Sequence, residues 1–69
     1  MVSFNPDEFG MLLVAARVKA KMSQTEVAQA SGIDQSQISR WERGEAVPSL
    51  RYLYQVATAL SFKPAKLLP

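Results

Sequence analysis

Cysteine and histidine, two residue types that carry much of protein chemistry, do not occur in this 69-residue sequence. Their absence excludes disulfides, zinc sites and histidine-based catalysis. The sequence also has no paired carboxylates on one helix face and no glycine loop that would cradle a phosphate, so we expect neither an enzyme nor a metal or other cofactor. The chain must therefore fold on a hydrophobic core, alone or with the aid of dimerisation.

Long hydrophobic runs are also absent. The longest, residues 11–16, is far too short to cross a bilayer. Asp7 and Glu8 lie near the N-terminus, where a secretory leader would carry basic residues. We therefore expect no signal peptide and no membrane partner. The lack of cysteine fits a cytoplasmic location, where thiols stay reduced.

Charge of either sign is nearly balanced, with eight Lys and Arg residues against six Asp and Glu residues and a formal net charge of +2. A strongly basic chain would indicate a nucleic-acid partner, and this mild excess does not do so by itself. The placement of the basic residues therefore carries more information than their number.

Capping residues and prolines predict where five helices begin. The starts are Asn5-Pro6, Ser23 with Glu26 as a capping box, Asp34 with Gln37 in the same relation, Ser49, and Lys63-Pro64. The first helix should run to about residue 20. Gly32 is expected to end the second helix and Gly44 the third.

Apolar residues at helical spacing predict which helix faces are buried. The first helix carries Phe9, Leu13, Ala16 and Ala20, and the fourth carries Leu50, Leu53, Val56, Ala57 and Leu60. No alternating run or hairpin dipeptide indicates a strand. The sequence thus predicts one compact all-α domain that spans residues 1–69.

The stretch 24–41 is typical of two short helices that meet at a tight corner. Small Ala28 allows the helices to approach closely, and Gly32 can adopt a positive φ. The apolar residues expected to face the rest of the domain are Val27, Ile33, Ile38 and Trp41. The polar residues left outward on the later helix of this pair, the third in the chain, are Gln35, Ser36, Ser39 and Arg40. This layout predicts a helix-turn-helix with a polar reading face.

Further matching positions run along nearly the whole chain, and together they point to a known family. They are Arg17, Ser23-Gln24, Ala28, Gly32, Ile38, Trp41-Glu42, Gly44, Pro48-Ser49-Leu50, Ala57 and Leu60. This combination resembles the Cro/C1-type helix-turn-helix family, which includes the lambda-like phage repressors. The resemblance implies a five-helix lambda-repressor-like domain that binds double-stranded DNA in a bacterial or phage-infected cell. Ser31 departs from the family, which usually has an apolar residue before the turn glycine.

The resemblance also implies a function and two contacts. The function is a sequence-specific transcription regulator, most simply a repressor that occupies a palindromic operator as a homodimer. One contact is an ion pair between Arg17 and Glu42, which could instead be two independent solvated charges. The other is a dimer surface, for which the candidates are Val47, Phe62, Leu67 and Leu68. The last three could instead close the core.

A recognition helix lies in the major groove, so the outward residues of the third helix are candidates for base contacts. Gln35 suits adenine and Arg40 suits guanine, with Ser36 and Ser39 beside them. The residues expected to contact phosphates are Gln24, Arg43 and Arg51. The Asp34 carboxylate would repel phosphate unless it caps the third helix, and we expect it to form that cap.

One feature does not follow from the resemblance. A second apolar stripe, formed by Met11, Val14, Ala15 and Val18, lies on the first helix opposite Phe9 and Leu13. We expect other helices to cover it; if they do not, it is a contact surface for a second subunit or a partner protein. The competing function is therefore a protein-interaction module or an antitoxin-type autoregulator. No small-molecule ligand is indicated.

Overall fold

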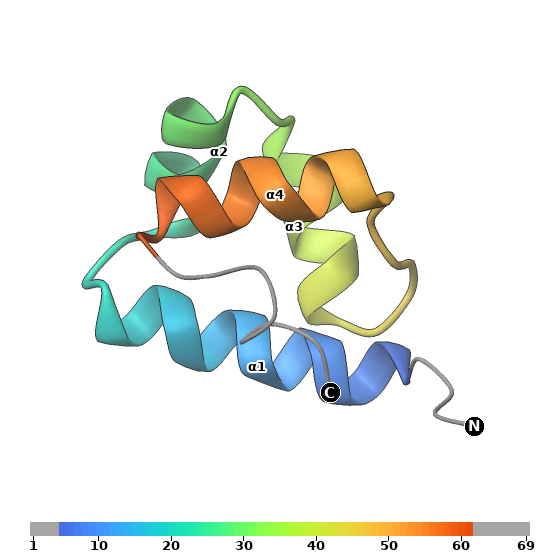
Figure 1. Ribbon diagram of the computed structural model, residues 1–69. Helices are drawn as coiled ribbons and strands as arrows, with labels where there is room; N and C mark the ends of the chain where they lie inside the picture. The colour runs from blue at the N-terminus through green and yellow to red at the C-terminus, as the bar shows by residue number, and fades with distance from the viewer. Residues whose placement is uncertain (1–4, 62–69) are drawn as a thin grey trace.

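The fold is all-helical, as predicted. The computed structural model describes residues 5–61, and this part of the chain forms the helices α1 (Pro6–Lys19), α2 (Gln24–Ser31), α3 (Gln35–Glu42) and α4 (Leu50–Ala59) (Figure 1). No strand occurs within those residues. The fifth helix, expected to begin at Lys63-Pro64, lies outside them.

Three of the helices begin at the capping residues that the sequence indicates. The Asn5 side chain accepts hydrogen bonds from the amides of Asp7 and Glu8, at 2.9 and 3.2 Å. Ser23 and Glu26 form a complete capping box, in which each side chain accepts from the other residue's backbone amide. Ser49 accepts from the amide of Tyr52 at 3.2 Å. These local contacts satisfy amides that a helix leaves without partners at its start.

The expected cap at Asp34 is wrong. Asp34 occupies the N-cap position of α3, but its side chain makes no capping hydrogen bond. A capping carboxylate would accept a hydrogen bond from the amide of Gln37. That amide donates instead to the Asp34 backbone carbonyl at 3.0 Å. The carboxylate is therefore an exposed negative charge at the start of α3.

The corner between α2 and α3 depends on two small residues. Gly32 adopts a φ of 75°, which other residues rarely adopt, and its amide donates to the Ala28 carbonyl at 2.9 Å. Ser31, the departure from the family pattern, is buried. Its hydroxyl donates to the Ala28 carbonyl and accepts from the amide of Ile33. A polar residue is therefore accommodated at this turn because both of its hydrogen-bonding roles are satisfied.

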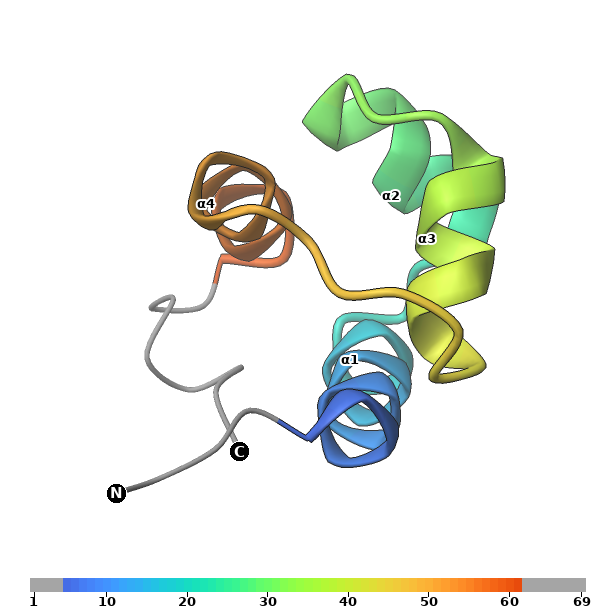
Figure 2. The ribbon, with the colours of Figure 1, turned by 90° about the vertical axis from the view of Figure 1, so that its right-hand side faces the viewer.

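The core lies between α1, the α2–α3 pair and α4. In Figure 2, α4 is on the left, α2 and α3 are on the right, and α1 is below. The buried apolar residues are Phe9, Leu13, Ala16, Val27, Ile33, Ile38, Trp41, Leu53, Val56, Ala57 and Leu60. Ala20 is partly buried against them. The expected inner faces of α1, α2 and α3 are therefore confirmed.

Leu50 is an exception to the predicted stripe on α4, because its side chain is 68% exposed. It is the first residue of α4, one turn before the part of the helix whose residues are buried. Helical periodicity indicates the side on which a residue lies, but the inner face of the helix begins only where another element covers it.

Gly10 allows α1 and α3 to approach closely. It is buried, and a Cβ at this position would lie 2.7 Å from the carbonyl oxygen of Trp41 and 2.8 Å from that of Glu42. Only a residue without a side chain fits against this backbone. The end of α3 is therefore held directly on α1.

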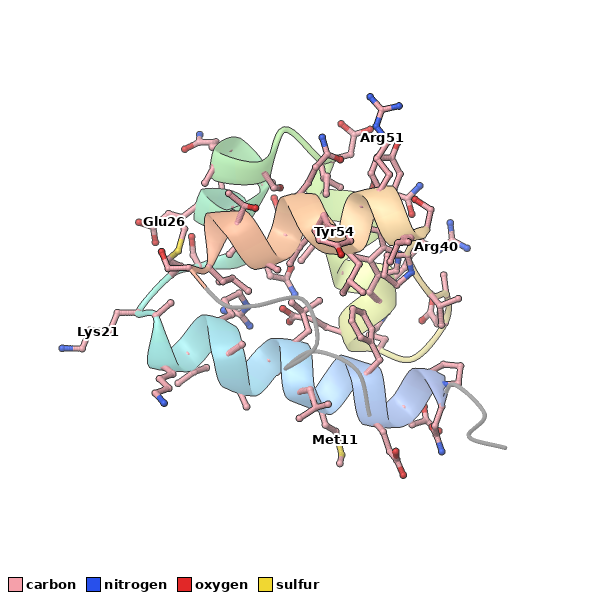
Figure 3. The ribbon with its side chains drawn as sticks, in the orientation of Figure 1. Met11, Lys21, Glu26, Arg40, Arg51 and Tyr54 are labelled. Carbon is pink, nitrogen blue, oxygen red and sulfur yellow. The ribbon has the colours of Figure 1, made fainter. Side chains whose placement is uncertain are left out.

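The second apolar stripe of α1 is not covered by the other described helices, contrary to our expectation. Met11 is 68% exposed and Val18 is 62% exposed, and Ala15 is also exposed. Figure 3 shows Met11 pointing away from α1 on the side opposite α4. Val14 is partly buried. None of the helices within residues 5–61 is long and apolar enough to cross a membrane.

Candidate nucleic-acid interface

The outer face of α3 is set by the residues that anchor its inner face. Ile38 and Trp41 are almost completely buried, with exposures of 0% and 1%. This register leaves Gln35, Ser36 and Arg40 exposed and Ser39 partly exposed. The polar residues that the sequence assigns to the outer face are therefore together on one accessible side of a short, anchored helix.

An ion pair joins the end of α3 to α1. Arg17 donates from Nε to Glu42 Oε2 at 2.7 Å and from Nη2 to Oε1 at 3.0 Å. Its remaining Nη1 donates to the Met22 carbonyl at 3.1 Å. The two side chains are only 18% and 5% exposed. The hydrogen bonds to Glu42, more than its charge, raise the pKa of Arg17 above its ordinary value. The pair implied by the family resemblance is therefore present and largely buried.

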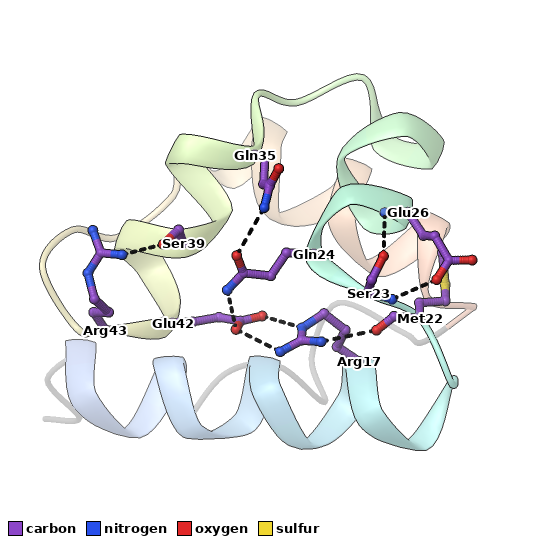
Figure 4. A network of polar contacts seen from close by, with 9 residues as sticks. All are labelled: Arg17, Met22, Ser23, Gln24, Glu26, Gln35, Ser39, Glu42 and Arg43. Atoms are coloured by element: carbon purple, nitrogen blue, oxygen red, sulfur yellow. Dashed lines mark hydrogen bonds and ion pairs between the residues drawn. The ribbon is translucent and has the colours of Figure 1, made fainter.

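Gln24 extends this ion pair to the start of α3. Its Nε2 donates to Glu42 Oε1 at 2.9 Å, and its Oε1 accepts from Gln35 Nε2 at 3.4 Å (Figure 4). Thr25 completes the chain by donating to Gln35 Oε1 at 3.1 Å. The two glutamines, expected to contact a phosphate and a base separately, are thus connected to each other. The role of Thr25 was not predicted, because capping and periodicity carry no signal for it.

Arg43 is held beside α3 by two acceptors. Its Nε donates to Glu45 Oε2 at 2.7 Å, and its Nη1 donates to the Ser39 hydroxyl. Arg43 and Glu45 are 54% and 52% exposed, so the pair is solvated. The hydrogen bond between them raises the pKa of Arg43 and lowers that of Glu45, and the charge of Arg40 lowers the latter further. Glu45, whose role was also not predicted from the sequence, therefore competes with any anion for Arg43 and Arg40.

Arg40 and Arg51 lie at the same end of the molecule in Figure 3, whereas Lys21 lies at the opposite end. Arg51 is in the first turn of α4, is exposed and makes no hydrogen bond or ion pair with the described residues. The loop and the start of α4 therefore bring a third arginine to the end of the molecule that carries the exposed residues of α3.

Of the dimer candidates, only Val47 falls within the described residues. It is 46% exposed in the loop before α4. Phe62, Leu67 and Leu68 lie outside the described residues. Among residues 5–61, no group of three or more Asp, Glu, His or Cys residues could hold a metal ion.

The paired short helices α2 and α3, the left-handed glycine between them and the polar outer face of α3 define a helix-turn-helix domain. A family model described as helix-turn-helix matches residues 13–67. The chain belongs to this helix-turn-helix family.

Individual relatives agree with the family. The chain is 40% identical to y4dL of Sinorhizobium fredii, an uncharacterised HTH-type transcriptional regulator, over 99% of its own length and 37% of that protein's. It is 35% identical to the restriction-modification controller protein C.AhdI from Aeromonas hydrophila, with a TM-score of 0.87 over 90% of this chain and 94% of that one. The clp gene regulator ClgR from Corynebacterium glutamicum is 26% identical, with a TM-score of 0.84 over 96% of this chain and 86% of that one.

Proposed function

We propose that this protein is a sequence-specific repressor that binds a palindromic operator as a homodimer, with α3 in the major groove. The observation that carries the proposal is the anchoring of α3. Two buried residues hold its inner face, so its outer residues are presented in a fixed register. A recognition helix must be rigid in this way, because a base edge is read by hydrogen bonds of defined direction.

Direct readout would come from the first two turns of α3. Gln35 can bind the N6 and N7 positions of adenine, and Arg40 can bind O6 and N7 of guanine, each pairing being worth about 1–3 kcal/mol of discrimination. Ser36 and Ser39 both donate and accept, so they support either base. Ser39 also accepts from Arg43, which restrains it on the side of the helix that faces the loop.

Phosphate contacts would come from Gln24 and the two arginines that flank α3, Arg43 and Arg51. Gln24 lies at the first position of α2, where the helix dipole favours an anion. Arg43 would exchange Glu45 for a phosphate, and Arg51 is already accessible. Because few cations surround α3, one half-site would bind weakly, and each phosphate contact would add to the salt dependence of binding.

Weak half-site binding supports a dimer, which would roughly double the contacts and read half-sites about one helical turn apart. Val47 in the exposed loop and the residues Phe62, Leu67 and Leu68 are the proposed contacts. Similarity to a restriction-modification controller over nearly all of that protein supports a role as a controller of the same kind. We propose that residues 1–69 form a single domain.

Selection of bound sequences from a random DNA pool tests the proposal, followed by Gln35→Ala and Arg40→Ala. Each variant should lose the preference at its own base position and keep the others. Gln29→Ala, which removes an exposed glutamine from α2, is the matched control and should leave every position unchanged. Uniform weakening by Gln35→Ala and Arg40→Ala would assign these residues to the DNA backbone, and selection of no sequence would overturn sequence-specific repression.

The exposed stripe of α1 favours a second function, binding of a partner protein. Met11 and Val18 are both more than 60% exposed on one helix. Exposed apolar surface of this kind marks interaction sites in soluble domains. If the protein bound no DNA even at low salt, and Met11→Ser with Val18→Ser abolished a protein complex, the interaction module would replace the repressor as its function.

A further inference from the structure

The hydrogen bonds that run from Glu42 through Gln24 to Gln35 are oriented, because Glu42 can only accept whereas each glutamine both donates and accepts (Figure 4). We propose that the Glu42 carboxylate sets the orientation of the Gln35 amide through Gln24, and so acts as a positioning residue for base preference. The proposal rests on the function proposed above, in which Gln35 contacts a base. It assigns a role in recognition to a glutamate at the far end of α3, about two turns from the base-reading position.

The orientation originates at Glu42, because an ionised carboxylate accepts hydrogen bonds and cannot donate them. Arg17 binds both of its oxygens, and the side chain is only 5% exposed, so water has little access to it. Gln24 must therefore turn its Nε2 towards Glu42, as the 2.9 Å contact shows. Its Oε1 is then directed away from Glu42 and towards Gln35, at the start of α3.

The same logic applies one step further along the network. Gln24 Oε1 is only an acceptor, so Gln35 must turn its Nε2 towards it. Thr25 donates to Gln35 Oε1 from the other side, which agrees with this orientation. Gln35 Nε2 then keeps one free N–H, and Gln35 Oε1 keeps one free lone pair. The major-groove edge of adenine requires one donor and one acceptor of this kind.

A neutral amide in place of Glu42 would remove the direction from the network. Glutamine both donates and accepts, so Gln24 could bind it in either orientation with similar energy. Gln35 would then present its donor and acceptor in either order, and one of these orders places like groups opposite each other on adenine. The charge of Glu42, in addition to its hydrogen bonds, is therefore the feature that maintains base preference.

The test compares Glu42→Gln with Gln24→Met, which keeps the length of the side chain but breaks the chain of hydrogen bonds. Binding to the selected operator and to its single-base variants is measured by competition. Both variants should reduce the discrimination at the base position identified by Gln35→Ala by about fivefold, and leave the Arg40 position unchanged. In a Gln35→Ala background, Glu42→Gln should have no further effect on that position. Val56→Ala, a buried substitution in α4, is the control for lost stability and should leave every preference unchanged.

A second measurement needs no DNA. In ¹⁵N-labelled protein, Glu42→Gln should shift the side-chain amide resonances of both Gln24 and Gln35, although Gln35 does not touch residue 42. The side-chain amide of Gln29, which lies outside the network, should not move. If Glu42→Gln does not fold, Gln24→Met provides the same test at Gln35.

The outcomes separate this proposal from the proposed function. If Gln35→Ala relaxes one position and both Glu42→Gln and Gln24→Met keep it, the positioning role is overturned and the repressor stands. An unmoved Gln35 resonance in either variant also overturns it. Absence of sequence preference in the wild-type protein would overturn the proposed function itself, and with it the base on which Glu42 could act.

Discussion

At the scale of single residues, Glu42 accepts three hydrogen bonds from two neighbouring side chains. It accepts from Nε and Nη2 of Arg17 and from Nε2 of Gln24. A buried carboxylate is stable only when it is paired and hydrogen-bonded, because transfer from water is costly for a charge. Loss of a partner therefore has a different consequence here from loss of a partner at the surface.

Arg17→Met should lower the free energy of unfolding by about 3–5 kcal/mol, because it leaves the Glu42 charge buried without its cation. The double variant Arg17→Met with Glu42→Leu should recover much of this loss, since no unpaired charge remains. Urea denaturation measures both. Arg43→Met, which breaks the exposed pair with Glu45, is the matched control and should have a much smaller effect. Equal losses for Arg17→Met and Arg43→Met would show that the buried pair behaves as a solvated one.

Glu26 gives the protein a predictable response to acid. The backbone amide of Ser23, and after it the Ser23 hydroxyl, lower the pKa of Glu26 below its ordinary value of 4.5. Because the pKa is lower in the folded state, this carboxylate stabilises the fold above pH 4.5 and loses that effect as the pH falls through its folded pKa. Glu26→Gln keeps a capping box but does not titrate. The melting temperature should therefore fall less steeply between about pH 5 and pH 3 for the variant than for the wild-type protein. An identical decline would contradict the role of the capping carboxylate.

At the scale of elements, the contact between α1 and α3 depends on backbone lying against backbone. Gly10 faces the carbonyl groups of Trp41 and Glu42, which are the last residues of α3. Carbonyl groups of a helix cannot move aside as a flexible side chain can. An alanine at position 10 would raise helix propensity, but its Cβ would clash with these carbonyl groups.

Gly10→Ala should destabilise the protein by about 1–2 kcal/mol, because overpacking costs more than the gain of about 1 kcal/mol in helix propensity. Ala15→Gly is the matched control, since Ala15 is exposed on the same helix. Only propensity should act there, with a loss of about 1 kcal/mol. Chemical denaturation of both variants measures the two effects. A more stable Gly10→Ala variant would show that α1 and α3 can separate without cost.

At the scale of the whole molecule, the distribution of charge matters more than its small total. Arg40 and Arg51 lie at one end of the molecule and Lys21 lies at the other. A phosphate backbone that follows α3 would meet the two arginines and not the lysine. The net charge of +2 does not describe this distribution, in which Arg40 and Arg51 share one end and the acidic Asp34 and Glu45 flank α3.

Arg51→Ala should make the plot of log binding constant against log salt concentration shallower by about one unit, because one phosphate contact is lost. Base preference should not change, since the contact carries no sequence information. Lys21→Ala removes the same charge from the opposite end and should leave the slope unaltered. Titrations of DNA at several salt concentrations provide the measurement. Equal changes in the two variants would indicate a response to net charge alone.

The parts of the fold that were predictable depend on contacts between residues near in sequence. The caps at Asn5, Ser23 and Ser49 and the left-handed Gly32 each involve a few neighbouring residues, so the signal is complete in the sequence. The predicted cap at Asp34 was wrong because the backbone carbonyl and the carboxylate of Asp34 compete for the amide of Gln37. The backbone conformation decides between these two acceptors. The Arg17–Glu42 pair came from a family resemblance, because spacing carries no information on which distant charges meet.

The sequence by itself determined the helices, most of their inner faces and the residues exposed on α3, because capping and periodicity are local properties. Only the tertiary structure decided what distant segments do to one another. It left Met11 and Val18 uncovered, placed Gly10 on the end of α3, and joined Gln24 to Glu42 and Gln35. Such contacts depend on how whole helices pack, and packing is fixed by the shape of the complete core.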